Sequence, residues 1–189
     1  MNSTRQLLID SMKDLLWERG YDATSPNLVL ERSGAGKGSF YHHFKGKKEL
    51  AIAAMDARAD ELIEEFELIF SGNAPWLNKL EQYLLMSRDG LKGCRMGRIA
   101  QDPSMEDALL RVPMKRYFNH AQQGLQQLLR DAQNAGQLSQ TLNPQQLSVA
   151  IISVLQGGFV ISRALNDRDM VNTACQGLMA ILKQQSQST

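Results

Sequence analysis

Hydrophobic residues recur at helical spacing from the start of the chain, and charged residues fill the positions between them. Leu8, Met12 and Leu15 fall on one side of a helical wheel, and Gly20 follows as a C-terminal cap. The pattern predicts an amphipathic helix that stops just before Gly20. Because charge interrupts this segment throughout, it has no apolar core of the kind that a signal peptide needs.

The next stretch, "TSPNLVLERSG", carries the start and stop signals of a short helix. Ser25 can act as N-cap, Pro26 suits the first helical position, and Gly34 can end the helix. A glycine turn then leads into "KGSFYHHF", after which Gly46 breaks the pattern and a long helix begins at Lys47. This order of elements is the plan of a helix-turn-helix.

Beyond Gly72 every periodic segment has the spacing of a helix. Residues 74–91 and 106–138 show apolar positions at i, i+3 and i+4, and residues 143–167 and 170–185 are also expected to be helices. Asn143 and Pro144 are a cap and a first helical residue, and Pro113 is expected to bend or divide the helix in which it lies. No run of alternating β-branched residues predicts a strand. The sequence therefore predicts an all-α fold.

Charge and cysteine content narrow the class of protein. The 189 residues carry a formal net charge of +1 and the pI is near 7.8, so a basic surface must come from local clustering. Two distant cysteines, Cys94 and Cys175, provide neither a zinc finger nor a secreted disulfide framework. The most apolar stretch, residues 147–165, contains Gln156 and Arg163 and is expected to be a helix buried in protein. We therefore expect a cytoplasmic protein without a membrane span.

The stretch "GAGKGSFYHHFKGKKEL" invites comparison with a phosphate-binding P-loop. A P-loop needs Ser or Thr directly after its lysine, but Gly38 separates Lys37 from Ser39, and Glu31 occupies the position of the opening glycine. A nucleotide-dependent enzyme is therefore a poor alternative, and no cofactor is expected. A metal site is not expected either, because adjacent histidines on a helix point about 100° apart and no third ligand is evident.

Basic residues gather in this one stretch. No acidic residue precedes Glu49 in a window that holds four lysines, whereas the helix that follows is rich in Asp and Glu. The lysines are Lys37, Lys45, Lys47 and Lys48. A nearly neutral chain thus carries one local patch suited to phosphate, which is typical of a module that reads nucleic acid.

Two segments together, "TRQLLIDSMKDLLWERGYDATS" and "SGAGKGSFYHHFKGKKEL", resemble the DNA-binding domain of the tetracycline-repressor (TetR) family. The rest of the chain resembles the family in length and helical character. The resemblance implies a helix-turn-helix DNA-binding domain at residues 1–46 and a helical ligand-binding and dimerisation domain at residues 47–189. It also implies a homodimer built on the last two long helices, with operator DNA and a small-molecule inducer as partners.

The resemblance assigns DNA contacts to individual residues. The residue that caps the second helix would meet a phosphate, the recognition helix would face base edges and phosphates, and the following helix would anchor a phosphate at its start. These positions are Ser25, then Lys37, Gly38, Ser39, Tyr41 and His42, then Lys47 and Lys48. His43 is equally suited to packing, and Phe40 and Phe44 are expected to be core. Gly36 and Leu28 depart from the family, which more often has Ser or Pro at the first position and a polar residue at the second.

Candidates for a ligand site are less specific. We expect Cys94 to lie near a helix start beside Lys92, Arg95 and Arg98, where the cations and free N–H groups would favour the thiolate and make it a sensor of oxidants or electrophiles. The alternative is a small apolar residue in a pocket. Aromatic and sulfur-containing side chains that could line such a pocket, or form ordinary core, are Trp76, Tyr83, Met86, Met96, Tyr117, Phe118, His120 and Phe159.

The sequence as a whole favours a ligand- or redox-responsive transcriptional repressor that is not an enzyme. Two recognition helices of a homodimer would enter successive major grooves of a palindromic operator. A ligand, or modification of Cys94, would move the helix that Lys47 begins. The alternatives are a constitutive DNA-binding protein without a ligand and the nucleotide-dependent enzyme considered above.

Overall fold

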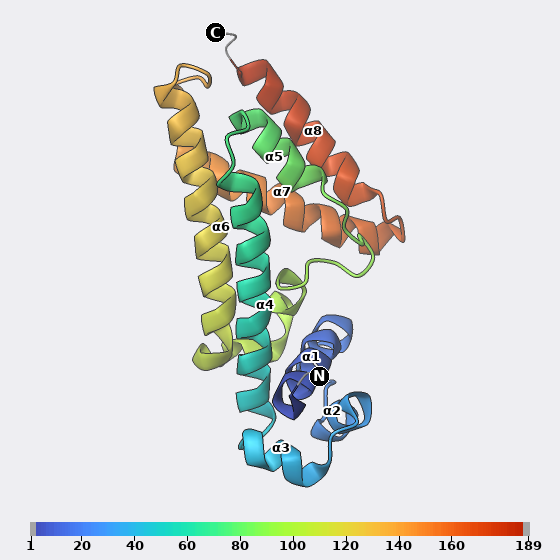
Figure 1. Cartoon of the computed structure of the whole chain (residues 1–189). Coiled ribbons are helices and arrows are strands. Elements are labelled where there is room, and N and C mark those ends of the chain that lie inside the picture. The colour runs from blue at the N-terminus through green and yellow to red at the C-terminus, as the bar shows by residue number, and fades with distance from the viewer. Residues whose placement is uncertain (1–2, 187–189) are drawn as a thin grey trace. The chain divides into compact units, whose positions relative to one another are not determined.

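A computed structural model describes residues 3–186 and is all-α over that range, as expected from the sequence. These residues form eight α-helices and two short 3-10 helices, with no strand and a single isolated bridge between Leu138 and Ser186. Figure 1 shows these helices in chain order from blue to red. The chain divides into two compact units. The first unit comprises the chain up to Leu62 together with Arg95–Tyr117, and the second comprises Ile63–Cys94 with the chain from Phe118 onward.

The first unit contains α1 (Thr4–Arg19), α2 (Pro26–Ser33), α3 (Lys37–His43) and the first part of α4 (Lys47–Phe70). Capping residues set these boundaries as expected. Ser25 Oγ accepts a hydrogen bond of 3.3 Å from the N–H of Leu28, and Gly34 ends α2 in the left-handed conformation at φ 67°. Helix α1 ends at Gly20, whose φ of 83° suits a residue without Cβ.

Ion pairs join α1 to the first part of α4. Lys13 binds Glu61, and Arg58 binds both Glu61, at 2.7 Å, and Asp14, at 3.6 Å. Partial burial opposes the charged form of Lys13, but Glu61 and Asp10 raise the pKa of its ammonium above its ordinary value. The network fixes the helix-turn-helix on the helix that follows it.

The rest of the first unit is a compact, irregular segment. It contains η1 (Gly97–Gln101), η2 (Pro103–Glu106) and the start of α6 (Ala108–Asn134). Asp102 links η1 to η2 and caps η2 by accepting from the N–H of Ser104 at 3.0 Å. Helix α6 continues through Pro113, so the proline does not divide the helix. The N–H that proline lacks would have bonded to the carbonyl of Leu109 in the first turn, so only one bond near the helix end is lost.

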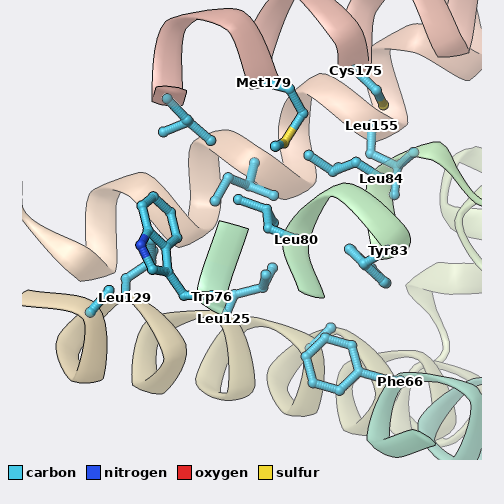
Figure 2. Packing of buried hydrophobic residues seen from close by; sticks show 14 of the residues in the cluster. Phe66, Trp76, Leu80, Tyr83, Leu84, Leu125, Leu129, Leu155, Cys175 and Met179 are labelled. Atoms are coloured by element: carbon cyan, nitrogen blue, oxygen red, sulfur yellow. The ribbon is translucent and has the colours of Figure 1, made fainter. Parts of the chain in front are cut away.

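The second unit is built around α5 (Trp76–Leu85), α7 (Pro144–Leu165) and α8 (Met170–Gln185), with the later parts of α4 and α6. Figure 2 shows the side chains of α5, Leu80 and Leu84 among them, between Met179 of α8 and Leu125 of α6. All four of these side chains are almost completely buried. Burial of this apolar cluster holds the helices of the unit together.

Glycines permit close contacts between helices of the second unit. A Cβ at Gly158 of α7 would lie 2.9 Å from Cα of Val171, and one at Gly124 of α6 would lie 2.4 Å from the Phe66 ring. Glycine is therefore required where α7 meets α8 and where α6 meets α4. Gly157, beside Gly158, has open space around its Cβ position instead.

Helix α7 is long and apolar enough to cross a membrane when judged by length and composition alone. Within its most apolar window, 33% of the residues are buried, and the helix packs along α8. A core helix of a soluble protein passes the same test, so α7 is weak evidence for a membrane. Its remaining apolar face is exposed and includes Val149 and Val160.

Candidate nucleic-acid interface

The aromatic side chains on α3 and at its C-terminal end are divided between the core and the surface. Phe40 and Phe44 are 1% and 3% exposed, as expected of core residues, whereas Tyr41 is 56% exposed. The other residues to which the sequence assigned DNA contacts on α3 and at the head of α2 are exposed as well, namely Ser25, Lys37, Gly38, Ser39 and His42. His43 is partly buried. One side of α3 therefore holds the domain together and the other is available for DNA.

The start of α3 has no side-chain cap. Gly36 occupies the N-cap position with extended backbone, φ −73° and ψ 150°, and offers no side-chain acceptor to the first N–H groups of the helix. These groups have no acceptor within the helix either, because the first turn of any α-helix lacks them. The start of α3 therefore presents backbone donors beside Lys37.

Two lysines begin α4 and are held differently. The ammonium of Lys47 lies 4.0 Å from the centre of the Tyr21 ring, a cation–π contact. Lys48 instead binds the carboxylate of Asp107, and this hydrogen bond, helped by the backbone N–H of Leu109, holds the pKa of Asp107 below its ordinary value. Both lysines are partly buried. Lys47 and Lys48, which are adjacent lysines in the sequence, thus have different binding partners in the structure.

Other residues at this surface were missed by the sequence reasoning. The guanidinium of Arg5 lies 5.4 Å from the centre of the Phe44 ring and adds a cation near the end of α3. Glu49, two residues after Lys47, accepts a 2.8 Å hydrogen bond from the backbone N–H of Lys45. No sequence motif indicates the roles of Tyr21, Asp102 and Asp107. Their contacts join segments that lie about eighty or sixty residues apart in the sequence.

The residues suggested for a ligand site fall in both units. Trp76, Tyr83 and Phe159 are 5–6% exposed and belong to the core of the second unit, where His120 binds Glu67 at 2.6 Å. The remaining aromatic and methionine candidates are Met86 and Phe118 in the second unit and Met96 and Tyr117 in the first. Met96 lines a recess of about 10 Å³, which has room for about one water molecule.

Cys94 lies near the start of a 3-10 helix but not at the start of an α-helix. It lies in a loop three residues before η1, which spans only five residues, and it packs partly against the core of the second unit. The free N–H groups invoked to favour its thiolate are therefore absent from that position. Among residues 3–186, no group of three or more His, Cys, Asp and Glu side chains is arranged to hold a metal ion.

The chain is similar to known transcriptional regulators over most of its length. Residues 8–54 match the family model for bacterial regulatory proteins of the tetR family, and residues 77–178 match the tetracyclin repressor-like C-terminal domain. An uncharacterized HTH-type transcriptional regulator of Lactococcus lactis subsp. lactis is 26% identical over 183 residues, 92% of this chain and 90% of the relative. The transcriptional regulator AcuR of Cereibacter sphaeroides is 27% identical over 152 residues, 77% of this chain and 69% of the relative.

Solved structures agree in fold. Escherichia coli NemR in its reduced form superposes with a TM-score of 0.85 at 19% identity, covering 98% of each chain. A TetR regulator from Chloroflexus aurantiacus gives 0.86 at 22% identity, covering 98% of this chain and 97% of the other. Fold, exposed recognition helix and matched regions define a DNA-binding transcriptional regulator rather than an enzyme. The chain belongs to the tetR family.

Proposed function

We propose that the protein is a repressor that binds a palindromic operator as a homodimer and leaves it when a small molecule or an electrophile acts on the chain. The observation that carries this proposal is the outer side of α3, where exposed Lys37, Ser39 and Tyr41 precede Lys47 at the start of α4. Residues 1–46 would be the DNA-binding domain and residues 47–189 the ligand-binding and dimerisation domain. One relative of the chain, DhaR of Mycobacterium sp., is named a transcriptional repressor and is 22% identical over 169 residues.

The dimer is supported by the uncovered face of α7. Val149, Ser153, Gly157 and Val160 recur at helical spacing, and the three with side chains are exposed. Exposed apolar residues also occur on α8, where Ile181 is 60% exposed. A second copy of the chain would cover this face through a two-fold contact, in which the same surface is used twice. Such a dimer has the symmetry of a palindromic operator and would act in the cytoplasm.

Release is supported by the way the chain connects the two units. Cys94 is the last residue of a segment of the second unit, and Arg95 is the first residue of a segment of the first unit. Helix α4 likewise contributes Lys47 to the first unit and Phe66 to the second. A ligand held by the second unit, or an adduct on Cys94, would shift one of these connections and with it Lys47. It can do so only if it binds the released state more tightly than the operator-bound state.

Operator binding is tested by fluorescence anisotropy with labelled DNA from upstream of the protein's own gene, with unrelated DNA as competitor. Lys47→Ala should weaken binding and lower the salt slope by about one, because one phosphate contact is lost. Lys115→Ala removes the same charge from an exposed position on α6 and is the matched control. Equal effects of the two substitutions, or no preference over competitor, would refute the assignment of the site.

Release by an electrophile is tested with the same assay and with mass spectrometry of the adduct. Burial raises the pKa of the Cys175 thiol, so Cys175 should react more slowly than the half-buried Cys94. Treatment should lower operator affinity in the unaltered protein and in Cys175→Ser, but not in Cys94→Ser. If neither electrophiles nor metabolites change the affinity, the alternative of a constitutive DNA-binding protein is favoured.

A further inference from the structure

The Tyr21 ring restricts the side chain that is proposed to anchor a phosphate. Its centre lies 4.0 Å from the Lys47 ammonium, and Tyr21 itself is partly buried in the turn between α1 and α2. A lysine side chain that is ordered before DNA arrives loses less conformational freedom when it binds a phosphate. The neutral ring leaves the positive charge of the ammonium uncompensated, whereas a carboxylate partner would offset it.

The turn that carries Tyr21 is fixed by a residue from a distant part of the sequence. The backbone N–H of Tyr21 donates a 2.7 Å hydrogen bond to Oδ2 of Asp102, which lies between η1 and η2. Both the hydroxyl and the N–H of Ser104 donate to Oδ1 of the same carboxylate, at 2.6 and 3.0 Å. Both oxygens of Asp102 are therefore used, one to fix its own loop and one to hold the turn.

Local geometry leaves this turn little freedom. Gly20, just before Tyr21, has a φ of 83°, and a Cβ there would lie 2.7 Å from Oδ2 of Asp102. The buried side chain of Thr24 donates a 2.7 Å hydrogen bond to the carbonyl of Gly20. The close approach of the carboxylate thus requires glycine at position 20. Asp102, Tyr21 and Lys47 form a continuous series of contacts within the first unit.

We infer that Tyr21 and Asp102 are positioning residues for DNA binding: Asp102 holds the backbone of Tyr21, and the Tyr21 ring holds the Lys47 ammonium where it meets a phosphate. The inference rests on the proposed function, because it requires that Lys47 contacts DNA. By this inference, the loop that carries Asp102, which lies outside the helix-turn-helix, contributes to operator affinity.

The first experiment is a double-mutant cycle of Tyr21 and Lys47, with operator affinity measured by anisotropy. Tyr21→Leu should weaken binding about three- to tenfold when Lys47 is present, because the cation–π contact is lost. It should change affinity less than twofold, on the order of experimental error, in the Lys47→Ala background. Tyr21→Phe keeps the ring and should bind about as well as the unaltered protein. An equal loss in both backgrounds would indicate a structural role and overturn the inference.

The cycle also separates this inference from the proposed function. If Lys47→Ala leaves operator affinity unchanged, Lys47 does not anchor a phosphate, and both the proposed DNA site and the positioning role of Tyr21 are overturned. If Lys47→Ala weakens binding while Tyr21→Leu does not, only the positioning role fails. Should Tyr21→Leu fail to fold, NMR of the unaltered protein decides, with Lys47→Arg used to assign the signals. The ε-methylene protons of Lys47 should be shifted upfield by the ring, and unshifted protons would overturn the inference.

Asp102 is tested by a substitution for which simple electrostatics predicts the opposite result. Asp102→Asn removes a negative charge from the DNA-binding unit, which by itself should tighten binding to DNA. The positioning role predicts weaker binding, by about two- to fivefold, because the charge-assisted hydrogen bond to Tyr21 is weakened. Asp22→Asn, an exposed position in the same turn, is the matched control and should bind equally or more tightly. Tighter binding by Asp102→Asn would overturn the role of Asp102.

Discussion

The ammonium group of Lys48 binds the carboxylate of Asp107, which lies 59 residues further along the chain. This ion pair leaves 44% of the Lys48 side chain and 35% of the Asp107 side chain exposed. It joins the start of α4 to the residue just before α6. Lys48 is thereby a link inside the first unit as well as a candidate for DNA contact.

Lys48→Ala should weaken operator binding less than Lys47→Ala does. The charge of the Lys48 ammonium is already partly offset by the Asp107 carboxylate, so its net contribution is smaller, about threefold in Kd against about tenfold for Lys47. Anisotropy at two salt concentrations measures both variants. A larger loss from Lys48→Ala would mean that Lys48, rather than Lys47, is the principal anchor.

Gly124→Ala should destabilise the protein by about 1–3 kcal/mol, because the added methyl group would overlap the buried ring of Phe66. Alanine otherwise favours a helix over glycine, so a stabilised variant would mean that the ring moves aside without cost. Urea unfolding followed by circular dichroism measures the change. Gln123→Ala, at an exposed neighbouring position on α6, should have little effect.

Gly36→Ser should stabilise α3 by a few tenths, about 0.3 kcal/mol, since a serine hydroxyl can cap N–H groups that glycine leaves uncapped. A Cβ at this position has open space, and the backbone there is already extended. Gly36→Ala adds the Cβ without the hydroxyl and should be less stable than either. Thermal unfolding of the three proteins gives the order directly, and equal stability of the Ser and Ala variants would contradict it.

Acid should destabilise the protein partly through Asp102. Partial burial favours its neutral form, but hydrogen bonds from Ser104 and from the N–H groups of Tyr21 and Asp22 outweigh this and hold the pKa of Asp102 below its ordinary value. A lowered folded-state pKa gives stability that is present above the unfolded pKa and is lost as the pH falls through the folded one.

Asp102→Asn should therefore lower Tm by about 2–4 °C at neutral pH. The difference from the unaltered protein should shrink below about pH 4. Other carboxylates with lowered pKa, such as Asp10 and Asp107, are present in both proteins, so the comparison isolates Asp102. A difference in Tm that is independent of pH would show that charge plays no part.

Val160→Lys should dissociate the proposed dimer and weaken its dimerisation by at least about tenfold, because an unpaired ammonium would be buried in the interface. Val160 is 57% exposed in the single chain, so folding itself should be little affected. Leu68→Lys, at a 75% exposed position on α4, is the control and should remain a dimer. Sedimentation equilibrium of the three proteins decides, and an unchanged assembly in Val160→Lys would place the interface elsewhere.

Local signals were sufficient for the helix-turn-helix. Ser25, Pro26 and Gly34 define α2 through contacts within a few residues of one another, so their roles follow from the sequence. Phe40 on α3 and Phe44, the residue that follows the helix, are buried as expected of core residues. These features do not depend on how distant segments meet.

The remaining features depend on tertiary contacts. Asp102 reaches Tyr21 across 81 residues, and no pattern near either residue indicates that contact. The segment around Cys94 carries glycines and cations that suit a helix start, yet the chain forms a loop and a short 3-10 helix there. Pro113 suggests a bend or a break, but α6 starts at Ala108 and continues through it. For Tyr21 and Asp102 the deciding partner lies outside the window from which a local pattern is taken.

Gly157 and Gly158 are adjacent in the sequence but face different surroundings. Gly158 faces α8 of its own chain, where any side chain would meet Val171, while Gly157 faces open space on the side proposed for the second subunit. Alanine at position 158 should therefore perturb the monomer, whereas alanine at position 157 should perturb only the proposed association of subunits. Two substitutions one residue apart can thus assign a loss of operator binding to misfolding or to failure of the proposed dimer to form.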